Sequence, residues 1–274
     1  MIYSKFRALN YKSDDNSQTF WERNKYIKDI FEHSTLIAQN YKEFNDIDEC
    51  VYFVAPSIRE NIVNDIYNVK QEKVICSFSC FTDDNYDGKE LMWAHYANSS
   101  KGIKIDFTVD CKFSFYIKPV EYKSKKFFDT NEKLEEEFKV HNLENIMCRK
   151  STAWQYEQEH RAIFSKYNNE FKPYKVNGKY FFPINIQKIT LGKGFFLDTR
   201  ASNPEQAQQD FENHILKIAS FIYDVLKNTD KYSSQMPEFY YYENKYSQEL
   251  VEIKTEKLEE YIKKNTVKVI NIIK

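Results

Sequence analysis

Two glutamates, Glu157 and Glu159, stand one residue apart in the stretch AWQYEQEHRAIF (153–164), and Arg161 follows two positions later. If the chain is extended there, alternate side chains project from one face and the three charged groups lie together. Neighbouring carboxylates raise each other's proton affinity, and an arginine lowers it again. Such a pair suits transfer of a sugar group, because a carboxylate can stabilise an oxocarbenium-like transition state. The alternative is an ordinary ion pair, since Glu157 and Arg161 would be i,i+4 partners in a helix.

Two serines and an arginine are the next candidates. Ser77 and Ser79 share one face of the apolar stretch KVICSFSCF (73–81), and Arg7 lies near the start of the chain. Two hydroxyls on a half-buried strand can orient a carboxylate or a ligand amide, and arginine suits bidentate capture of phosphate. The simpler interpretations are small polar residues that fill a strand and an exposed arginine at a strand end.

Metal and anion sites are less well supported. In FNDIDEC, Asp46, Asp48 and Glu49 could hold a divalent ion, but a capped turn explains them equally well. The five histidines, at 33, 95, 141, 160 and 214, include no pair at metal-ligand spacing, so we expect no zinc site. LGKGF (191–195) could form a small anion nest, with a turn after a strand as the alternative.

The elements that must position these residues follow from hydrophobic periodicity. Residues 2–9 alternate as a first strand with Arg7, residues 73–81 form the clearest strand, and the apolar residues 162–164 favour extension from about residue 159. A helix is predicted over 18–32, with Phe20, Ile27, Ile30 and Phe31 as its apolar face. Another is predicted over 88–101, closed by Gly102 as its cap. Further predicted elements are a helix over 57–70, a charged helical region over 130–150, and strands over 34–38, 103–107, 114–122, 179–184 and 184–192.

The predicted secondary structure changes near residue 200, from mixed strands and helices to mainly helices. We expect an α+β core over residues 1–200 and a helix-rich elaboration over 201–274 that packs on the core. Asn203, Pro204 and Glu205 are typical of a helix start, and the helix should run to about Leu226. The segment 201–274 could also receive a protein partner.

Composition excludes several classes of function. With 40 basic and 41 acidic residues the formal net charge is -1, which provides no broad surface for nucleic acid or an anionic membrane. The five glycines form neither G-x-G-x-x-G nor G-x-x-x-x-G-K-[ST], so the common dinucleotide and P-loop sites are absent. The five cysteines form no C-x-x-C pair, and there is no apolar leader or membrane-spanning run. We therefore expect a cytoplasmic protein that makes no membrane contact.

Several motifs occur together in an order that resembles the bacterial domain-of-unknown-function family 2971. They are IYSKFR, EFNDIDEC, CSFSCF, ELMWAHYANSSKGIKIDF, then Lys150 with AWQYEQEHRAIF, and ITLGKGF. The resemblance covers roughly residues 2–195, and the combination is more specific than any single motif. Where relatives often have proline in the turn FNDP, this chain has Ile47.

The motif order is also similar to that of ADP-ribosyltransferases of the arginine-serine-glutamate type. This resemblance implies a split mixed or antiparallel sheet with flanking helices, here with a C-terminal helical extension, and NAD as the substrate with no metal. It implies that Arg7 binds NAD phosphate, that Ser77 supports the nicotinamide ribose and the catalytic glutamate, and that Ser79 assists. Glu159 would bond the ribose 2′-hydroxyl and stabilise the oxocarbenium ion, and Glu157 would address the acceptor. Trp93, Tyr96 and Trp154 would wall the pocket, with Arg161 also beside NAD.

Three hypotheses stay open. The first is an enzyme that transfers ADP-ribose from NAD to a protein, a nucleic acid or water, as a bacterial toxin or an effector of antiviral defence. The second is a metal-dependent nuclease that uses Asp46, Glu49, Glu157 and Glu159. The third is a non-catalytic interaction module of a defence system, in which the glutamate pair and Arg161 form an internal ion network.

Overall fold

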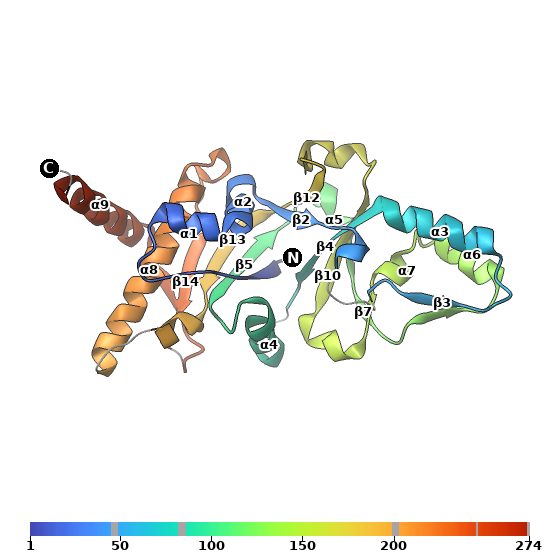
Figure 1. Ribbon diagram of the computed structural model, residues 1–274, viewed down its shortest axis with the longest axis horizontal. Coiled ribbons are helices and arrows are strands. Elements are labelled where there is room, and N and C mark those ends of the chain that lie inside the picture. The colour runs from blue at the N-terminus through green and yellow to red at the C-terminus, as the bar shows by residue number, and fades with distance from the viewer. Residues whose placement is uncertain (45–48, 82–85, 199–202, 245, 273–274) are drawn as a thin grey trace. The chain divides into compact units, whose positions relative to one another are not determined.

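Figure 1 shows the computed structural model, which describes residues 1–44, 49–81, 86–198, 203–244 and 246–272. Helices and strands both occur along the chain, and the fold is α+β as predicted. The chain divides into two compact units. Unit 1 comprises Met1–Ser34, Glu90–Thr108 and Asn185–Lys274, and unit 2 comprises Thr35–Lys89 and Val109–Ile184. This division differs from the boundary expected near residue 200. Within the described ranges, no helix has both the length and the apolar composition needed to cross a bilayer.

The strands of unit 1 form a mixed sheet in the order β15-β14-β13-β5-β1. Their bounds are β1 Tyr3–Ala8, β5 Gly102–Thr108, β13 Asn185–Leu191, β14 Glu238–Tyr242 and β15 Leu250–Ile253. β13 pairs with β14 in parallel, whereas the other neighbours are antiparallel. Because β14 and β15 come from the segment 201–274, that segment contributes strands as well as the expected helices.

The helices of unit 1 are α1 Ser17–Arg23, α2 Lys25–His33, α8 Pro204–Lys227 and α9 Thr255–Ile272, with short 3-10 turns η4 Lys193–Asp198 and η5 Asp230–Tyr232. The prediction of a single helix over 18–32 is wrong, because this segment forms two helices that are separated at Asn24. The Asn24 side-chain amide donates to the Phe20 carbonyl at 2.8 Å and to the Asn10 carbonyl at 3.0 Å, and thereby competes with the helical hydrogen bonds. The predicted start of α8 is confirmed, since the Asn203 side chain accepts from the Gln206 amide at 2.8 Å.

Helix α4 (Tyr86–Tyr96) ends earlier than predicted, and Gly102 is not its cap. The chain leaves the helix through Asn98, Ser99 and Ser100, whose φ angles are 48°, 54° and 67°. Gly102 instead begins β5 and pairs with Ala8. A Cβ atom at this position would lie 2.2 Å from the Arg7 carbonyl oxygen, so the glycine is required by the close approach of two strands.

Unit 2 has one central group of strands and three smaller ones. β4 (Lys73–Ser79), β10 (Glu159–Ser165) and β6 (Ile117–Pro119) run antiparallel in that order. Both β4 and the start of β10 confirm the prediction, whereas the strand predicted over 114–122 is divided. The remaining strands are β2 Thr35–Ala38 with β12 Lys179–Pro183 and β11 Lys175–Val176, β3 Tyr52–Val54 with β8 Lys126–Phe128, and β7 Glu121–Tyr122 with β9 Arg149–Lys150.

An apolar core in unit 2 joins these strands to the helices. The helices are α3 Glu60–Glu72, α5 Cys111–Ser114, α6 Asn131–Lys139 and α7 Glu144–Met147, with 3-10 turns η1 Tyr41–Glu43, η2 Thr152–Glu157 and η3 Asn169–Tyr174. Ile66 of α3 and Met147 of α7 are fully buried in one cluster with Ile75 of β4 and Ile163 of β10. This packing holds the ends of β4, β9 and β10 in place, where the charged residues gather.

Candidate functional site

Glu157 and Glu159 meet by a route that the sequence pattern did not predict. Glu157 ends the 3-10 turn η2, Gln158 has φ 43° and ψ 48°, and Glu159 opens β10. The two glutamates therefore do not share one face of an extended strand, which corrects the prediction. Their carboxylates nevertheless converge on one cation, because Lys150 Nζ lies 2.7 Å from Glu157 Oε2 and 3.2 Å from Glu159 Oε2.

A third carboxylate joins this group. Lys150 Nζ also lies 3.2 Å from Glu49 Oε1. Lys150 stands on β9, which is held against β7, and Glu49 belongs to the turn before β3. We refer to Glu49, Lys150, Glu157, Glu159 and Arg161 as the ion cluster. All five side chains are at most 8% exposed.

Arg161 binds two of these carboxylates. It lies on β10 two residues after Glu159, on the same face of the strand. Its Nε donates to Glu159 Oε1 at 2.7 Å and its Nη2 donates to Glu159 Oε2 at 3.2 Å. Nη2 also pairs with Glu49 Oε2, and Nη1 donates to the Met147 carbonyl. The Arg161 side chain is 0% exposed. With three carboxylates and two cations, the ion cluster carries a formal charge of −1 in a buried environment.

Glu159 is held in its ionised form. Burial alone would favour the neutral acid, but Arg161 and Lys150 outweigh it, and together with a hydrogen bond from Ser77 they hold the pKa of Glu159 at about 2. The same carboxylates raise the pKa of the Lys150 ammonium above its ordinary value, against the effect of burial. Antiparallel pairing of β10 with β4 places Glu159 opposite Ser79 and Arg161 opposite Ser77. The glutamate and the two serines of the sequence analysis therefore lie on neighbouring strands.

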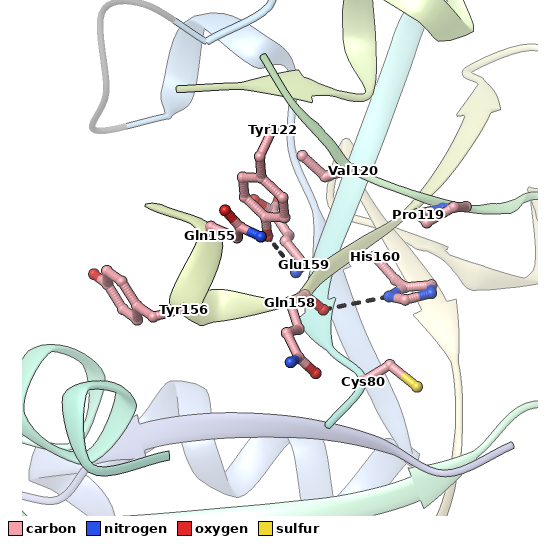
Figure 2. A pocket seen from close by; sticks show the side chains of 9 residues that line it. All are labelled: Cys80, Pro119, Val120, Tyr122, Gln155, Tyr156, Gln158, Glu159 and His160. Carbon is pink, nitrogen blue, oxygen red and sulfur yellow. Dashed lines mark hydrogen bonds between the residues drawn. The ribbon is translucent and has the colours of Figure 1, made fainter. Parts of the chain in front are cut away.

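A pocket of about 410 Å³ opens beside the cluster (Figure 2). Its lining includes Cys80, Tyr122, Gln155, Tyr156, Glu159 and His160. The Tyr122 hydroxyl accepts a hydrogen bond from the Glu159 amide at 2.6 Å, and burial raises the pKa of this phenol above its ordinary value. Tyr122 therefore keeps its proton at neutral pH and can serve as a donor.

His160 is another titratable group of this pocket. Burial lowers the pKa of its imidazole. Its Nδ1 lies 3.3 Å from the Gln158 carbonyl oxygen, as Figure 2 shows. Because a carbonyl oxygen can only accept, this contact is a hydrogen bond in the tautomer that carries the proton on Nδ1.

The other predicted residues are distributed between the units. Trp154 belongs to unit 2, and Lys150 Nζ lies 4.9 Å from the centre of its ring. Arg7, Trp93 and Tyr96 belong to unit 1. Trp93 is only 2% exposed, and its indole nitrogen donates to the Tyr242 hydroxyl at 3.0 Å, which is typical of a core residue. Tyr96 is 37% exposed.

Two weaker candidates can also be placed. The Gly192 and Gly194 amides of LGKGF donate to the Gly102 and Ser100 carbonyls, so these two N–H groups are already used and the turn interpretation is favoured over an anion nest. Asp46 and Asp48 lie outside the described residues.

Sequence reasoning missed three contributors to the site: Lys150 as the shared cation, Arg161 as the bridge to Glu49, and Tyr122. Lys150 and Tyr122 each stand in a two-residue strand, which is too short for a periodic signal. Glu49 was considered as part of an acidic turn and as a metal ligand of the nuclease hypothesis, but not as a partner of Arg161. No local pattern indicates that it meets Arg161, which is 112 positions further along the chain.

The geometry thus defines an α+β protein with a buried glutamate–lysine–arginine cluster next to a small polar pocket. The sequence model of one family, described as a protein of unknown function (DUF2971), matches residues 92–162. This match confirms the predicted relation to that family over a segment that contains Lys150, Glu157, Glu159 and Arg161. No curated protein and no solved structure matches the chain. Because the family's description names no reaction, function has to be inferred from the site.

Proposed function

We propose that this protein cleaves NAD at the bond between nicotinamide and ribose and transfers ADP-ribose to a protein, a nucleic acid or water. The observation that carries the proposal is the ionised Glu159, bonded by Ser77 and placed in the lining of a pocket. A serine that supports a glutamate on the neighbouring strand is what the resemblance to ADP-ribosyltransferases implies. The finer fold assignment, an ADP-ribosyltransferase-like split sheet, is part of this proposal.

The chemistry requires a negative charge close to a developing cation. When the glycosidic bond breaks, its electron pair leaves with nicotinamide and positive charge grows on the ribose carbon and ring oxygen. A fixed carboxylate in a site that excludes water stabilises such a charge more strongly than it would in solution. The ion cluster, with three carboxylates and two cations in contact, retains one formal negative charge for this purpose.

Several other residues have roles in the proposal. The oxygen of the acceptor hydroxyl or water bonds to the ribose carbon, and Glu157 receives the proton that this oxygen loses. Ser79, opposite Glu159 in the sheet register, supports the same region as Ser77. Trp154, next to Lys150, walls the nucleotide site, whereas the buried Trp93 is a core residue; the binding of NAD phosphate by Arg7 and a contact from Tyr96 stay predictions of the resemblance. A bacterial toxin or a defence effector in the cytoplasm is the setting we propose for this activity.

A second candidate is a non-catalytic module in which the ion cluster only supports the fold. It is favoured by the saturation of Glu159, whose two oxygens accept from Arg161 Nε, Arg161 Nη2 and Lys150 Nζ, in addition to the Ser77 hydroxyl. A carboxylate has about four acceptor positions, so these donors use its capacity. An NAD hydroxyl would then have to replace one of them.

Nicotinamide release from NAD by the purified protein distinguishes the two candidates. The transferase predicts turnover that falls at least about 100-fold in Glu159→Gln and clearly in Ser77→Ala, while the exposed helix residue variant Glu136→Gln is unaffected. Thermal unfolding of each variant shows whether the fold survives. If no variant or wild-type protein releases nicotinamide, with or without cell extract as a source of acceptors, the transferase proposal is wrong.

The nuclease hypothesis keeps one specific observation in its favour. Glu49, Glu157 and Glu159, three of its four acidic residues, converge within 3.2 Å of a common lysine. A nuclease of this kind is expected to have a catalytic lysine next to its acidic residues. The Glu157-Gln158-Glu159 motif contains none, and Lys150 would take that role. This hypothesis predicts Mg²⁺- or Mn²⁺-dependent cleavage of DNA or RNA that EDTA abolishes. Nicotinamide release that persists in EDTA would argue against it.

A further inference from the structure

Three possible metal ligands lie together at the end of helix α2, in unit 1. Asp29, Glu32 and His33 occupy positions i, i+3 and i+4, which are neighbours on a helical surface. Their ligand atoms all lie within 4.8 Å of one another. In the part of the chain that the structure describes, no other three His, Cys, Asp or Glu side chains come this close. A site with one imidazole and two carboxylates was not predicted from the sequence, because none of the five histidines has a second histidine at metal-ligand spacing.

The local electrostatics favour a cation at this place. His33 is the last residue of α2, and the carbonyl end of a helix carries a partial negative charge. Within the described ranges, Asp29 and His33 make no side-chain hydrogen bond or ion pair. Glu32 pairs with Lys28 at 2.7 Å, but both side chains are about one-third exposed. Such a surface ion pair contributes about 1 kcal/mol or less, so a divalent ion can displace the lysine.

A pocket of about 690 Å³ adjoins one of the three residues, Glu32. It lies between α1, α2 and the end of α8, and its lining includes Trp21, Lys25, Lys28, Glu32 and Asp224. Trp21 is 7% exposed, and its indole N–H finds no acceptor among the described residues. A buried donor without a partner costs about 1–3 kcal/mol, which a bound acceptor would recover. The wall of the pocket therefore contains a buried N–H donor that has no acceptor among the described residues.

We propose that Asp29, Glu32 and His33 bind a divalent transition metal ion at the rim of this pocket. One imidazole and two carboxylates suit zinc and similar borderline ions. Three protein ligands leave at least one coordination position for water or for an oxygen of a small anion. Because Glu32 belongs both to the metal ligands and to the pocket lining, that position adjoins the pocket, where Trp21 and Lys25 supply N–H donors.

Calorimetric titration of the purified full-length chain with ZnCl₂ tests this site. We expect one zinc ion per chain and a loss of affinity of about tenfold or more in His33→Ala and in Asp29→Ala. His141→Ala is the matched control, since this histidine is equally exposed but belongs to no such group, and it should bind zinc as the wild type does. Circular dichroism of the variants should be unchanged, because both replaced side chains are outside the core.

Cobalt replaces zinc as a probe of the ligand type. The proposal predicts d–d absorption bands without the intense charge-transfer band that a thiolate ligand would give, so binding at the exposed Cys111 is distinguished. Absence of zinc binding in the wild type, or unchanged binding in His33→Ala, would overturn the proposal. This test does not depend on NAD cleavage, so the two proposals fail separately.

Discussion

Removal of the Arg161 guanidinium is the strongest test of the ion cluster. In Arg161→Met the side chain keeps an apolar stem of similar length, but Glu49 and Glu159 lose the cation that bridges them. Both carboxylates stay below 9% exposure, so water cannot replace the lost partner without rearrangement of the core. Breaking a buried ion pair from one side costs about 3–5 kcal/mol of unfolding free energy.

The lowered pKa of Glu159 gives a second order-of-magnitude figure for the same contacts. Its pKa is held at about 2, against an ordinary value of 4.5, and each tenfold change in proton affinity corresponds to about 1.4 kcal/mol. The cluster therefore stabilises the ionised folded state by about 3 kcal/mol through this residue. Because the folded pKa is the lower one, this contribution is fully present above pH 4.5 and is lost as the pH falls toward 2. In Arg161→Met most of this dependence should disappear.

Urea unfolding measured at pH 7 and at several acidic pH values provides the assay. The control is Arg149→Met, since Arg149 pairs with the half-exposed Glu121 at 3.3 Å and should contribute about 1 kcal/mol or less. A double variant, Arg161→Met with Glu159→Leu, should recover part of the lost stability, because one unpaired charge is removed. If Arg161→Met costs no more than Arg149→Met, the cluster is not the buried network described above.

Three further substitutions test individual parts of the structure. Gly102→Ala should lower the unfolding free energy by about 2 kcal/mol or more, because the new methyl group meets the Arg7 carbonyl. Gly178→Ala, with φ 77° and no atom near the new methyl group, should cost about 1 kcal/mol in the same urea assay. Asn203→Ala should cost about 1 kcal/mol through loss of the α8 cap, measured by thermal unfolding; an unchanged midpoint would contradict the capping geometry. Lys150→Met removes one of the two cations bonded to Glu159 and leaves Arg161 as the other. The pKa of Glu159, followed by NMR titration of its carboxyl carbon, should therefore rise above 2; an unchanged value would show that Lys150 has no electrostatic effect.

Elements with a strong periodic pattern could be predicted from the sequence, and those ended by a single polar contact could not. β4, with seven residues of alternating apolar character, lies where it was expected. The break at Asn24 depends on a side-chain amide that reaches Asn10, which no helical pattern reveals. Gly102 was taken for a helix cap, although its absent Cβ serves the approach of β1 to β5.

The candidate site shows the same division. Glu157, Glu159 and Arg161 could be identified as site candidates because they lie in one short motif. Ser77 could be identified because it lies in another. Their arrangement could not be predicted. Gln158 has a left-handed backbone conformation, so Glu157 lies outside the strand that Glu159 begins, and its carboxylate joins the cluster through the ion pair with Lys150. Glu49 and Lys150 enter through contacts between distant segments, and such contacts leave no trace in local periodicity.

Nicotinamide release by wild type and Glu159→Gln, measured side by side with their thermal unfolding, tests the central claim most directly. The proposed transferase predicts that wild-type protein releases nicotinamide from NAD and that Glu159→Gln, while still folded, loses at least about 100-fold of that rate. Equal rates in the two proteins, or no release by a folded wild type with any source of acceptors, would contradict the account.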